Sequence, residues 1–267
     1  MHLSGHPTPR PTRPTGVGET PSVDWHDINC HGEVGSYRRV VREVVAESSA
    51  EVVALGLPVD PSAGLDAFAE TVPDPLAPLH HAGLGWLAEP LGALCAQLGM
   101  LVPDRPAAEG ALAELKAYAD QVRDNATLLT DEEERERFDA LAAAIDGTAT
   151  VVRTSGLLAL GTRDFAHDRV TALVGDLVGE GMAAAVSGVP SAEDLRVVAR
   201  ERAAGVGAEI ATRIGAMLDA LVRQSERLNE LNGAITLLSE GIEDGFENSS
   251  GNGADADAGP PPERGPE

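Results

Sequence analysis

Aromatic side chains and cysteines are scarce in this sequence of 267 residues. Aromatic residues make up 3% of the chain, whereas hydrophobic residues as a whole reach 43%. Cores built from Ala, Val and Leu with few rings are usual in helix bundles and unusual in β-sandwiches, so the composition favours an all-α fold. The two cysteines, Cys30 and Cys95, are far apart and form no Cys-x-x-Cys pair. This excludes a disulfide framework and fits a reducing compartment.

Positive charge is also in short supply. The chain has 20 Lys and Arg residues against 43 Asp and Glu residues, and its formal net charge is −23. It contains no basic run and no aromatic stacking platform, and so many negative charges are repelled by nucleic acid and by an anionic membrane surface. We therefore expect no nucleic-acid partner, and we interpret the acidity mainly as a source of solubility.

Long uninterrupted hydrophobic runs are missing as well. The longest candidate, residues 157–189, is broken by several charged residues, so no integral membrane segment is expected. Residues 1–22 are rich in Pro and Thr and lack the apolar core of a signal peptide. The expected location is the cytoplasm, and export by a route without a cleaved signal stays open.

Composition divides the chain into four parts. Residues 1–22 are predicted to form a disordered Pro-rich tail and residues 247–267 a disordered acidic tail, because neither holds enough large apolar residues for a core. Residues 23–102 form an N-terminal helical segment. Residues 103–246 form an elongated bundle of antiparallel helical hairpins that ends in a long helix.

The N-terminal segment shows helical periodicity. Apolar residues spaced three and four apart predict an amphipathic helix that ends near residues 56–58, although their β-branched side chains also permit a strand. Prolines then leave room for one short helix near residues 65–71. The apolar residues 79–101 predict two short helices hinged near Pro90, since proline cannot donate a hydrogen bond in a helix interior. The periodic residues of the first helix are Val34, Tyr37, Val41, Val44 and Val45.

After Pro103 the apolar spacing alternates between three and four, the pattern of a helix that faces another helix. Thr130 and Glu133 form a capping box at the start of a new helix, whose acidic first turn suits the positive end of the helix dipole. We therefore expect an antiparallel hairpin joined near Thr130. The apolar residues are Leu112, Leu115, Ala119, Val122, Ala126 and Leu129 before the turn, and Phe138, Leu141, Ile145 and Val152 after it.

A second hairpin is predicted downstream. Apolar and small residues form a stripe over residues 170–184, in which three glycines would let another backbone approach closely. The turn at residues 188–191 ends this helix, and Ser191 with Asp194 caps the last one. The three glycines are Gly175, Gly179 and Gly181.

The last helix carries the clearest pattern, a hydrophobic seam from Ile210 to Ile242 with one polar exception, Gln224. Its flanking positions are mostly small and uncharged, which favours burial inside the protein's own bundle over a free coiled-coil dimer. We expect the seam to pack on the stripe at residues 170–184 and only its last turns to remain as a docking surface. One seam position holds Ile214, Leu221, Leu228, Ile235 and Ile242, and the other holds Ile210, Met217, Leu231 and Leu238.

No arrangement of residues indicates catalysis. The sequence has no Gly-x-Ser-x-Gly, His-Glu-x-x-His or phosphate-loop motif, and no carboxylate pair in an apolar setting. His80 and His81 point in different directions on a helix, which favours a structural role over a shared metal ion. The loop-like cluster of His26, Cys30 and His31 has no fourth ligand nearby. We predict a protein that is not an enzyme and that holds no cofactor or metal.

The segment LHHAGLGWLAEPLGAL at residues 79–94 resembles the AGLGWL…PL…L segment of actinobacterial proteins that carry a W-x-G-type helical hairpin. The hairpin after Pro103 resembles the core of that family, and residues 170–238 resemble the downstream helices of its longer members. The W-x-G turn itself is absent, and its nearest equivalent is Phe138-Asp139-Ala140. The family's export signal, an aromatic residue followed four residues later by an acid, is also missing.

The resemblance implies a long-form member with a degenerate motif. Members of this family are substrates or accessory components of type VII secretion and work as helical-hairpin dimers. Our first hypothesis is therefore a non-catalytic interaction protein of type VII secretion that pairs with a helical protein partner, in a homo- or hetero-oligomer. The alternative is a cytoplasmic chaperone or immunity-type protein that masks a secreted toxin or effector.

The expected partner contacts fall into two groups. Trp86 and Phe138 lie near predicted turns. Ile235, Leu238 and Ile242 lie at the end of the last helix, which is expected to be longer than any helix before it and to lack an intrachain partner there.

Overall fold

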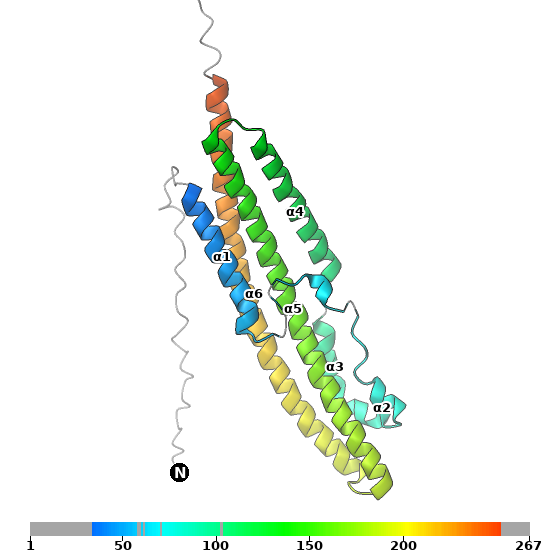
Figure 1. Cartoon of the computed structure of the whole chain (residues 1–267). Helices are drawn as coiled ribbons and strands as arrows, with labels where there is room; N and C mark the ends of the chain where they lie inside the picture. Colours follow the sequence, from blue (N-terminus) through cyan, green and yellow to red (C-terminus); the bar gives the residue numbers. More distant parts are fainter. Residues whose placement is uncertain (1–33, 58–59, 61, 70, 102–103, 252–267) are drawn as a thin grey trace, which may run out of the picture.

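The protein is built from helices alone over the part of the chain that its computed structural model describes, which confirms the predicted all-α fold. The helices lie side by side in a long, narrow bundle (Figure 1). In chain order they are α1 (Val34–Ala54), η1 (Leu65–Ala67), α2 (Ala77–His81), η2 (Gly85–Leu87), α3 (Ala88–Met100), α4 (Arg105–Thr127), α5 (Glu132–Ser187) and α6 (Ala192–Gly251). The described residues are 34–57, 60, 62–69, 71–101 and 104–251.

Most of the two predicted tails lies outside the described residues. This holds for all of residues 1–22 and for residues 252–267. α6 continues as a helix to Gly251, so the last helix ends later than residue 246, where the bundle was expected to end.

The two longest helices, α5 and α6, form an antiparallel hairpin that runs the length of the molecule (Figure 1). They contain 56 and 60 residues, and are about 84 and 90 Å long because each residue adds about 1.5 Å. The chain reverses after Gly188, whose positive φ of 72° ends α5 in the left-handed conformation that glycine adopts readily. The backbone N–H of Ser191 then donates to the Asp194 carboxylate, and the N–H of Asp194 donates to the Ser191 hydroxyl. The predicted turn and cap are confirmed.

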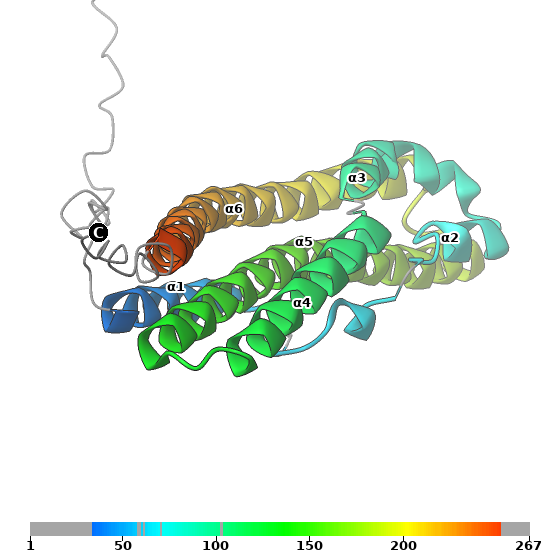
Figure 2. The ribbon, with the colours of Figure 1, turned by 90° about the horizontal axis from the view of Figure 1, so that it is seen from above.

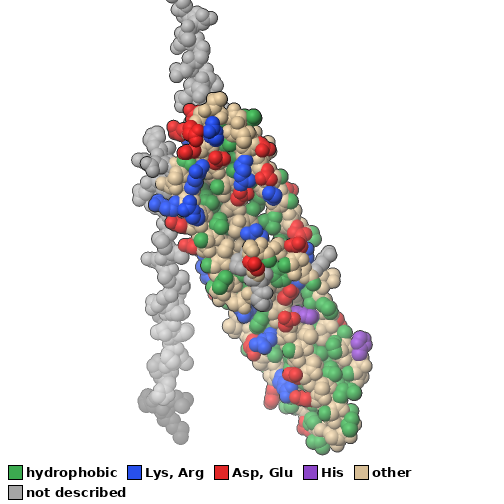
Figure 3. Space-filling model, viewed as in Figure 1, with side chains coloured by type: hydrophobic (Ala, Val, Ile, Leu, Met, Phe, Trp, Pro, Cys, Tyr) green, Lys and Arg blue, Asp and Glu red, His purple; other side chains and the backbone are tan. Residues whose placement is uncertain are grey.

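Shorter helices cover this hairpin. α4 packs along α5, and the short turn between them confirms the hairpin expected near Thr130. α1 contacts both α5 and α6, and α3 contacts α6 nearer the Gly188 turn (Figure 2). On the face drawn in Figure 3, charged side chains are denser around α1 and the start of α5 than over the end that holds α2.

α5 is a single helix where two were expected. The sequence pattern suggested one helix through Val152 and another from Val170, but the intervening residues continue the helix without a break. Two facts explain the difference. No proline occurs between residues 132 and 187, and the junction is apolar enough to be buried, with Leu157, Leu158 and Leu160 at most 1% exposed. Burial of this kind outweighs the roughly 1 kcal/mol that each helical glycine costs.

The start of α5 is capped one residue later than expected. Asp131, not Thr130, is the N-cap, and its carboxylate accepts hydrogen bonds from the N–H groups of Glu133 and Glu134 at 2.8 and 3.0 Å. Asp and Thr are both good N-cap residues, but a carboxylate also carries a negative charge toward the positive end of the helix dipole.

Two expectations for the segment before α4 were wrong in detail. The helix expected at residues 65–71 is a single 3-10 turn, η1. The break in residues 79–101 occurs at Gly83, whose φ is +73°, and not at Pro90. Pro90 is the third residue of α3, in the first helical turn, where its missing N–H has no intrahelical partner to lose.

The seam of α6 is buried in the protein's own bundle, but against a different part of α5 than expected. Leu231 packs beside Gly147, and the carbonyl of Gly241 accepts a hydrogen bond from Arg137 at 3.1 Å. These contacts place the C-terminal part of the seam, from about Leu231 onward, on the first third of α5. The expected partner, residues 170–184, instead shares a core cluster with the first turns of α6, near Leu195.

The two rows of the seam are buried to different extents. One row is at most 6% exposed, whereas the other is only half-buried in the described bundle. The first row consists of Ile210, Met217, Gln224, Leu231 and Leu238, and the second of Ile214, Leu221, Leu228, Ile235 and Ile242.

The glycines predicted to admit another backbone do not do so. Gly175 and Gly179 are exposed, and a Cβ added at either would meet no atom within 4 Å. Gly181 is buried, but the group that approaches it is the side chain of Leu84, 2.5 Å from the position of an added Cβ. A leucine side chain, and not a helix backbone, therefore uses the space.

Candidate functional site

α1 lies antiparallel to α6 in the groove between α5 and α6, and a buried polar pair fixes its position. The Ser48 hydroxyl donates to the Gln224 side-chain carbonyl at 2.7 Å, and the Gln224 amide donates to the Ser48 backbone carbonyl at 3.3 Å. Both residues are at most 1% exposed. Gln224 is the polar exception in the seam, and its function is to pair with α1. A buried polar pair of this kind stabilises only the register in which both members meet.

An ion-pair cluster lies one turn farther along α1. Glu51 is 9% exposed, and its two carboxylate oxygens accept hydrogen bonds from Arg223 at 2.7 and 2.9 Å. Arg227 donates to the same carboxylate at 3.2 Å. The hydrogen bonds from Arg223 and the charges of both guanidinium groups hold the pKa of Glu51 below its ordinary value, although burial acts in the opposite direction. The groove between α5 and α6 thus holds α1 partly through the Glu51 carboxylate.

The chain leaves this groove directly after α1. The Leu55 carbonyl accepts a hydrogen bond from Arg213. Leu57 then packs against Gly161 of α5, 3.0 Å from the position of an added Cβ. From there the chain crosses α5, where Arg163 donates to the Ala69 carbonyl at 3.0 Å. The α5–α6 hairpin itself continues for more than 20 residues in each helix toward Gly188.

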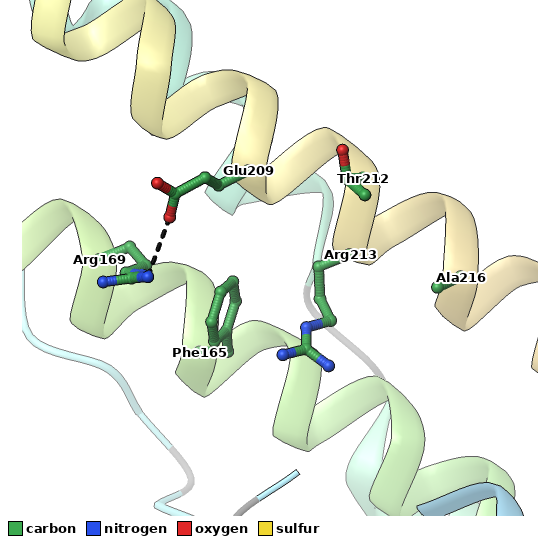
Figure 4. Close-up of a pocket in the computed structure, with 6 residues that line it drawn as sticks. All are labelled: Phe165, Arg169, Glu209, Thr212, Arg213 and Ala216. Carbon is green, nitrogen blue, oxygen red and sulfur yellow. Dashed lines mark ion pairs between the residues drawn. The ribbon is translucent and has the colours of Figure 1, made fainter. Parts of the chain in front are cut away.

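A pocket opens in the hairpin where α1 ends (Figure 4). It has a volume of about 480 Å³ and lies between the two long helices. Phe165 forms its apolar centre and lies between two arginines, with the guanidinium carbons of Arg213 and Arg169 at 4.5 and 5.5 Å from the ring centroid. The lining residues are Phe165 and Arg169 from α5 and Glu209, Thr212, Arg213 and Ala216 from α6.

The two pocket arginines differ in how they are held. Arg213 is half-buried, and its described contacts are the Leu55 carbonyl and the ring of Phe165. Arg169 forms an ion pair with Glu209 at 3.0 Å, and both side chains are about half exposed, at 52% and 53%. An exposed pair of this kind contributes about 0–1 kcal/mol. The pocket therefore presents cationic donors beside an aromatic ring, a setting that suits a carboxylate on an apolar segment.

The five residues expected to contact a partner do not lie together. Phe138, Ile235, Leu238 and Ile242 meet in one core cluster at the α4–α5 end of the bundle. Leu238 is 3% exposed, and the other three are half-buried. α5 accompanies α6 to this end, so the expectation that the end of α6 lacks an intrachain partner was wrong. A role of these side chains in partner binding stays a prediction.

Trp86 lies far from that cluster, in η2. It is half-buried against the core formed with α3 and α5, and the Arg196 guanidinium lies 5.1 Å from its ring centroid. The side chain therefore has an intrachain packing role, whatever else it contacts.

The structure places the remaining chemical candidates as follows. His80 and His81 are exposed, and no group of three potential metal ligands occurs among the described residues. The cluster of His26, Cys30 and His31 lies outside those residues. Burial raises the pKa of the Cys95 thiol, with a further contribution from Asp74, and this disfavours the reactive thiolate.

Sequence reasoning missed Phe165 and Arg213 because both lie on the flanks of long helices, outside the apolar rows. One signal was present. Arg213 precedes Arg227 by two heptads, so both arginines occupy the same helical position beside the seam.

α5 also satisfies the length and composition expected of a membrane-spanning helix. Its most apolar window has a mean hydropathy of 1.3, and 33% of that window is buried inside the protein. The core helix of a soluble protein satisfies the same criteria, so this feature is weak support for a membrane span.

Comparison of this chain with protein families, with curated proteins and with solved structures finds no match.

Proposed function

We propose that this chain is a non-catalytic interaction protein that binds a helix of a partner protein, and that it acts in type VII secretion as a substrate or accessory component. One observation carries the first part. α1 occupies the groove between α5 and α6 over 21 residues, whereas the hairpin continues well beyond the end of α1. A groove that already binds one helix offers a similar surface to a second helix farther along.

The chemistry of the groove supports binding and not catalysis. The pocket around Phe165 combines one ring, two arginines and one exposed carboxylate. Recognition of a charged, partly apolar segment is the function that this set of side chains serves best.

The secretion part of the proposal rests on the sequence resemblance at residues 79–94. Its test is the presence of the full-length protein in culture filtrate of the native host, with and without the secretion ATPase. Export that requires the ATPase supports a substrate. Retention in the cell in both strains contradicts that role and favours the chaperone or immunity-type alternative.

The binding part is tested by purifying the full chain from its host and identifying co-purifying proteins after chemical cross-linking. We expect a partner at near-stoichiometric amounts, cross-linked through a helical segment to α5 or α6. A protein that remains monomeric by light scattering and that cross-links to no partner contradicts the proposal.

A further inference from the structure

We propose that the pocket around Phe165 and Arg213 binds an acidic side chain on the partner helix, and that this helix continues the path of α1 along the α5–α6 groove. This inference rests on the proposed function, because it names the site and the chemistry of the partner that the function requires.

α1 provides a template for a helix bound in this groove. Its Glu51 carboxylate binds Arg223 and Arg227 of α6 while its apolar side chains pack in the groove. Arg213 stands two heptads before Arg227, at the same helical position, and so faces the same side of the groove. In α1 the carboxylate comes from Glu51, whereas at Arg213 the described residues supply the Leu55 carbonyl and no carboxylate.

A neutral carbonyl is a weaker acceptor than a carboxylate for a guanidinium group. The fork of Arg213 has five N–H donors, and the described residues supply one oxygen acceptor for them. The structure therefore leaves room at Arg213 for a second, charged acceptor.

The shape and polarity of the pocket also suit a helix that carries one carboxylate. Phe165 and Ala216 supply apolar surface to the pocket, and the arginines lie on either side of the Phe165 ring (Figure 4). The volume of about 480 Å³ fits several side chains of a helix and exceeds what one carboxylate needs. The side chains that α1 buries in the groove are Tyr37 and valines together with Ser48 and Glu51, so a partner helix with apolar residues around one Glu or Asp fits best.

The distribution of charge favours an acidic segment at this pocket over the rest of the surface. The chain carries a formal net charge of −23, so most of its surface repels an acidic segment. At the pocket, two arginines face one carboxylate, Glu209, and the local balance is positive. The Arg169–Glu209 pair is half exposed and therefore weak enough to rearrange when a partner carboxylate arrives. This location steers an acidic helix toward the pocket and away from the rest of the molecule.

The test uses the full-length protein and a fluorescent synthetic peptide with the sequence of α1, residues 34–54, as a probe of the groove. We expect saturable binding, measured by fluorescence anisotropy, that weakens about tenfold or more in Arg213→Glu, because a charge-assisted hydrogen bond is lost and a repulsion added. Arg200→Glu is the matched control. It makes the same charge change at an exposed arginine of α6, about 20 Å along the helix from Arg213, and is expected to leave binding within about twofold.

Charge reversal sharpens the test. A peptide with Glu51→Arg is expected to bind the wild-type protein poorly and to recover affinity for the Arg213→Glu protein. Because Arg213→Glu also loses its bond to the Leu55 carbonyl, a second pair of variants avoids that contact. Thr212 is exposed at the pocket rim, so Thr212→Lys is expected to tighten binding about threefold and Thr212→Glu to weaken it about threefold, with helical content by circular dichroism unchanged.

Several outcomes overturn the inference. Absence of saturable peptide binding does so, as does binding that is insensitive to Arg213 and Thr212 but sensitive to Arg227, since the peptide would then replace α1 in its own site. Affinity for free glutamate equal to that for the peptide would identify a small-molecule carboxylate site instead. If a native partner is found and Arg213→Glu does not weaken its binding, the inference fails while the proposed function stands. If no partner exists, the proposed function itself fails.

Discussion

The two ends of the α5–α6 hairpin are covered in different ways. At the end that holds the α4–α5 turn, two regular helices, α1 and α4, lie along the hairpin, and polar groups fix the register of α1. Toward the Gly188 end, short helices and the crossing segment after α1 cover the hairpin, and leucine side chains fill spaces left by helical glycines. These leucine–glycine contacts are Leu57 on Gly161, Leu65 on Gly156, Leu84 on Gly181 and Leu94 on Gly207.

This difference shows how one pair of long helices can accept two kinds of cover. A regular helix needs a matching row of apolar side chains, and α1 and α4 meet such rows. An irregular segment has no repeating row, so its isolated leucines need individual sockets, which glycine provides by lacking a side chain. The pocket at Phe165 lies at the boundary between the two kinds of cover, where α1 has ended.

The largest effect on stability is expected where the apolar row of α6 packs on α5, at the end of the hairpin that holds the α4–α5 turn. Leu231 is fully buried beside Gly147, so Leu231→Ala is expected to lower the free energy of unfolding by about 2–5 kcal/mol, from lost burial and the cavity left behind. Urea unfolding at pH 7 measures it. Val222→Ala on the same helix is the control, since Val222 is 60% exposed, and a change of about 0.5 kcal/mol or less is expected there. Equal losses in the two variants would contradict the buried row.

The next effect concerns the polar contact of α1. Glu51→Gln removes a carboxylate that two arginines bind, and about 1.5–3 kcal/mol of stability at pH 7 is expected to be lost. The folded-state pKa of Glu51 is lowered, so its stabilisation is present above the unfolded-state pKa of about 4.3 and is lost as the pH falls through the folded value. Stability of the wild type minus that of Glu51→Gln should therefore shrink as the pH drops below about 4.3. A difference that stays constant from pH 7 to pH 3 would show that the carboxylate charge has no such role.

The leucine sockets of the second end are tested by adding a single methyl group. Gly181→Ala and Gly156→Ala place a Cβ at 2.5 and 2.7 Å from leucine methyl groups, so each is expected to lower the free energy of unfolding by about 1–3 kcal/mol. Gly175→Ala and Gly179→Ala add the same group to the same helix in open space, so each is expected to raise it by about 0.5–1 kcal/mol through helix propensity. Thermal unfolding of the four variants provides the measurement. The same sign in all four would contradict the distinction between socket and surface glycines.

The smallest effect on stability is expected at Glu230 of α6, which lies near Glu47 of α1. Burial raises the pKa of Glu230, with a contribution from nearby Glu47. A raised folded-state pKa means that the stabilising, protonated form is present below the unfolded-state value and is lost as the pH rises through the folded value. Glu230→Gln is therefore expected to stabilise the protein at pH 7 by less than about 0.5 kcal/mol, and to have no effect near pH 3. Destabilisation at pH 7 in matched urea titrations would contradict this account.

The sequence predicted the two regular helices that cover one end of the hairpin, α1 and α4. It did not predict how the short helices and the crossing segment cover the other end. The spacing of Val34, Tyr37 and Val41 predicted α1, and the alternation after Pro103 predicted α4, because regular rows leave a period. The reversal at Gly188 and the cap formed by Ser191 and Asp194 were also predicted from local chemistry.

The contacts between single leucines and helical glycines follow no regular spacing in the sequence. Gly156 and Gly161 lower the local helix propensity of α5, and nothing in the sequence pattern shows that Leu65 and Leu57 fill the spaces beside them. The choice of Asp131 over Thr130 as the cap depended on two residues of similar propensity. For the candidate site, the heptad position of Arg213 and the approximate end of α1 could be predicted from the sequence, but not that the two lie side by side.

The groove beyond α1 is proposed to bind a helix that carries an acidic side chain. Hydrogen–deuterium exchange of the full-length protein, with and without an isotope-labelled α1-sequence peptide whose fragments differ in mass from those of the protein, tests this most directly. The account predicts slower amide exchange in residues 162–170 and 209–217 when the peptide is bound, with exchange in residues 34–54 and 223–238 unchanged. Faster exchange in residues 34–54, with no change in residues 209–217, would show that the peptide displaces α1 and would contradict the claim.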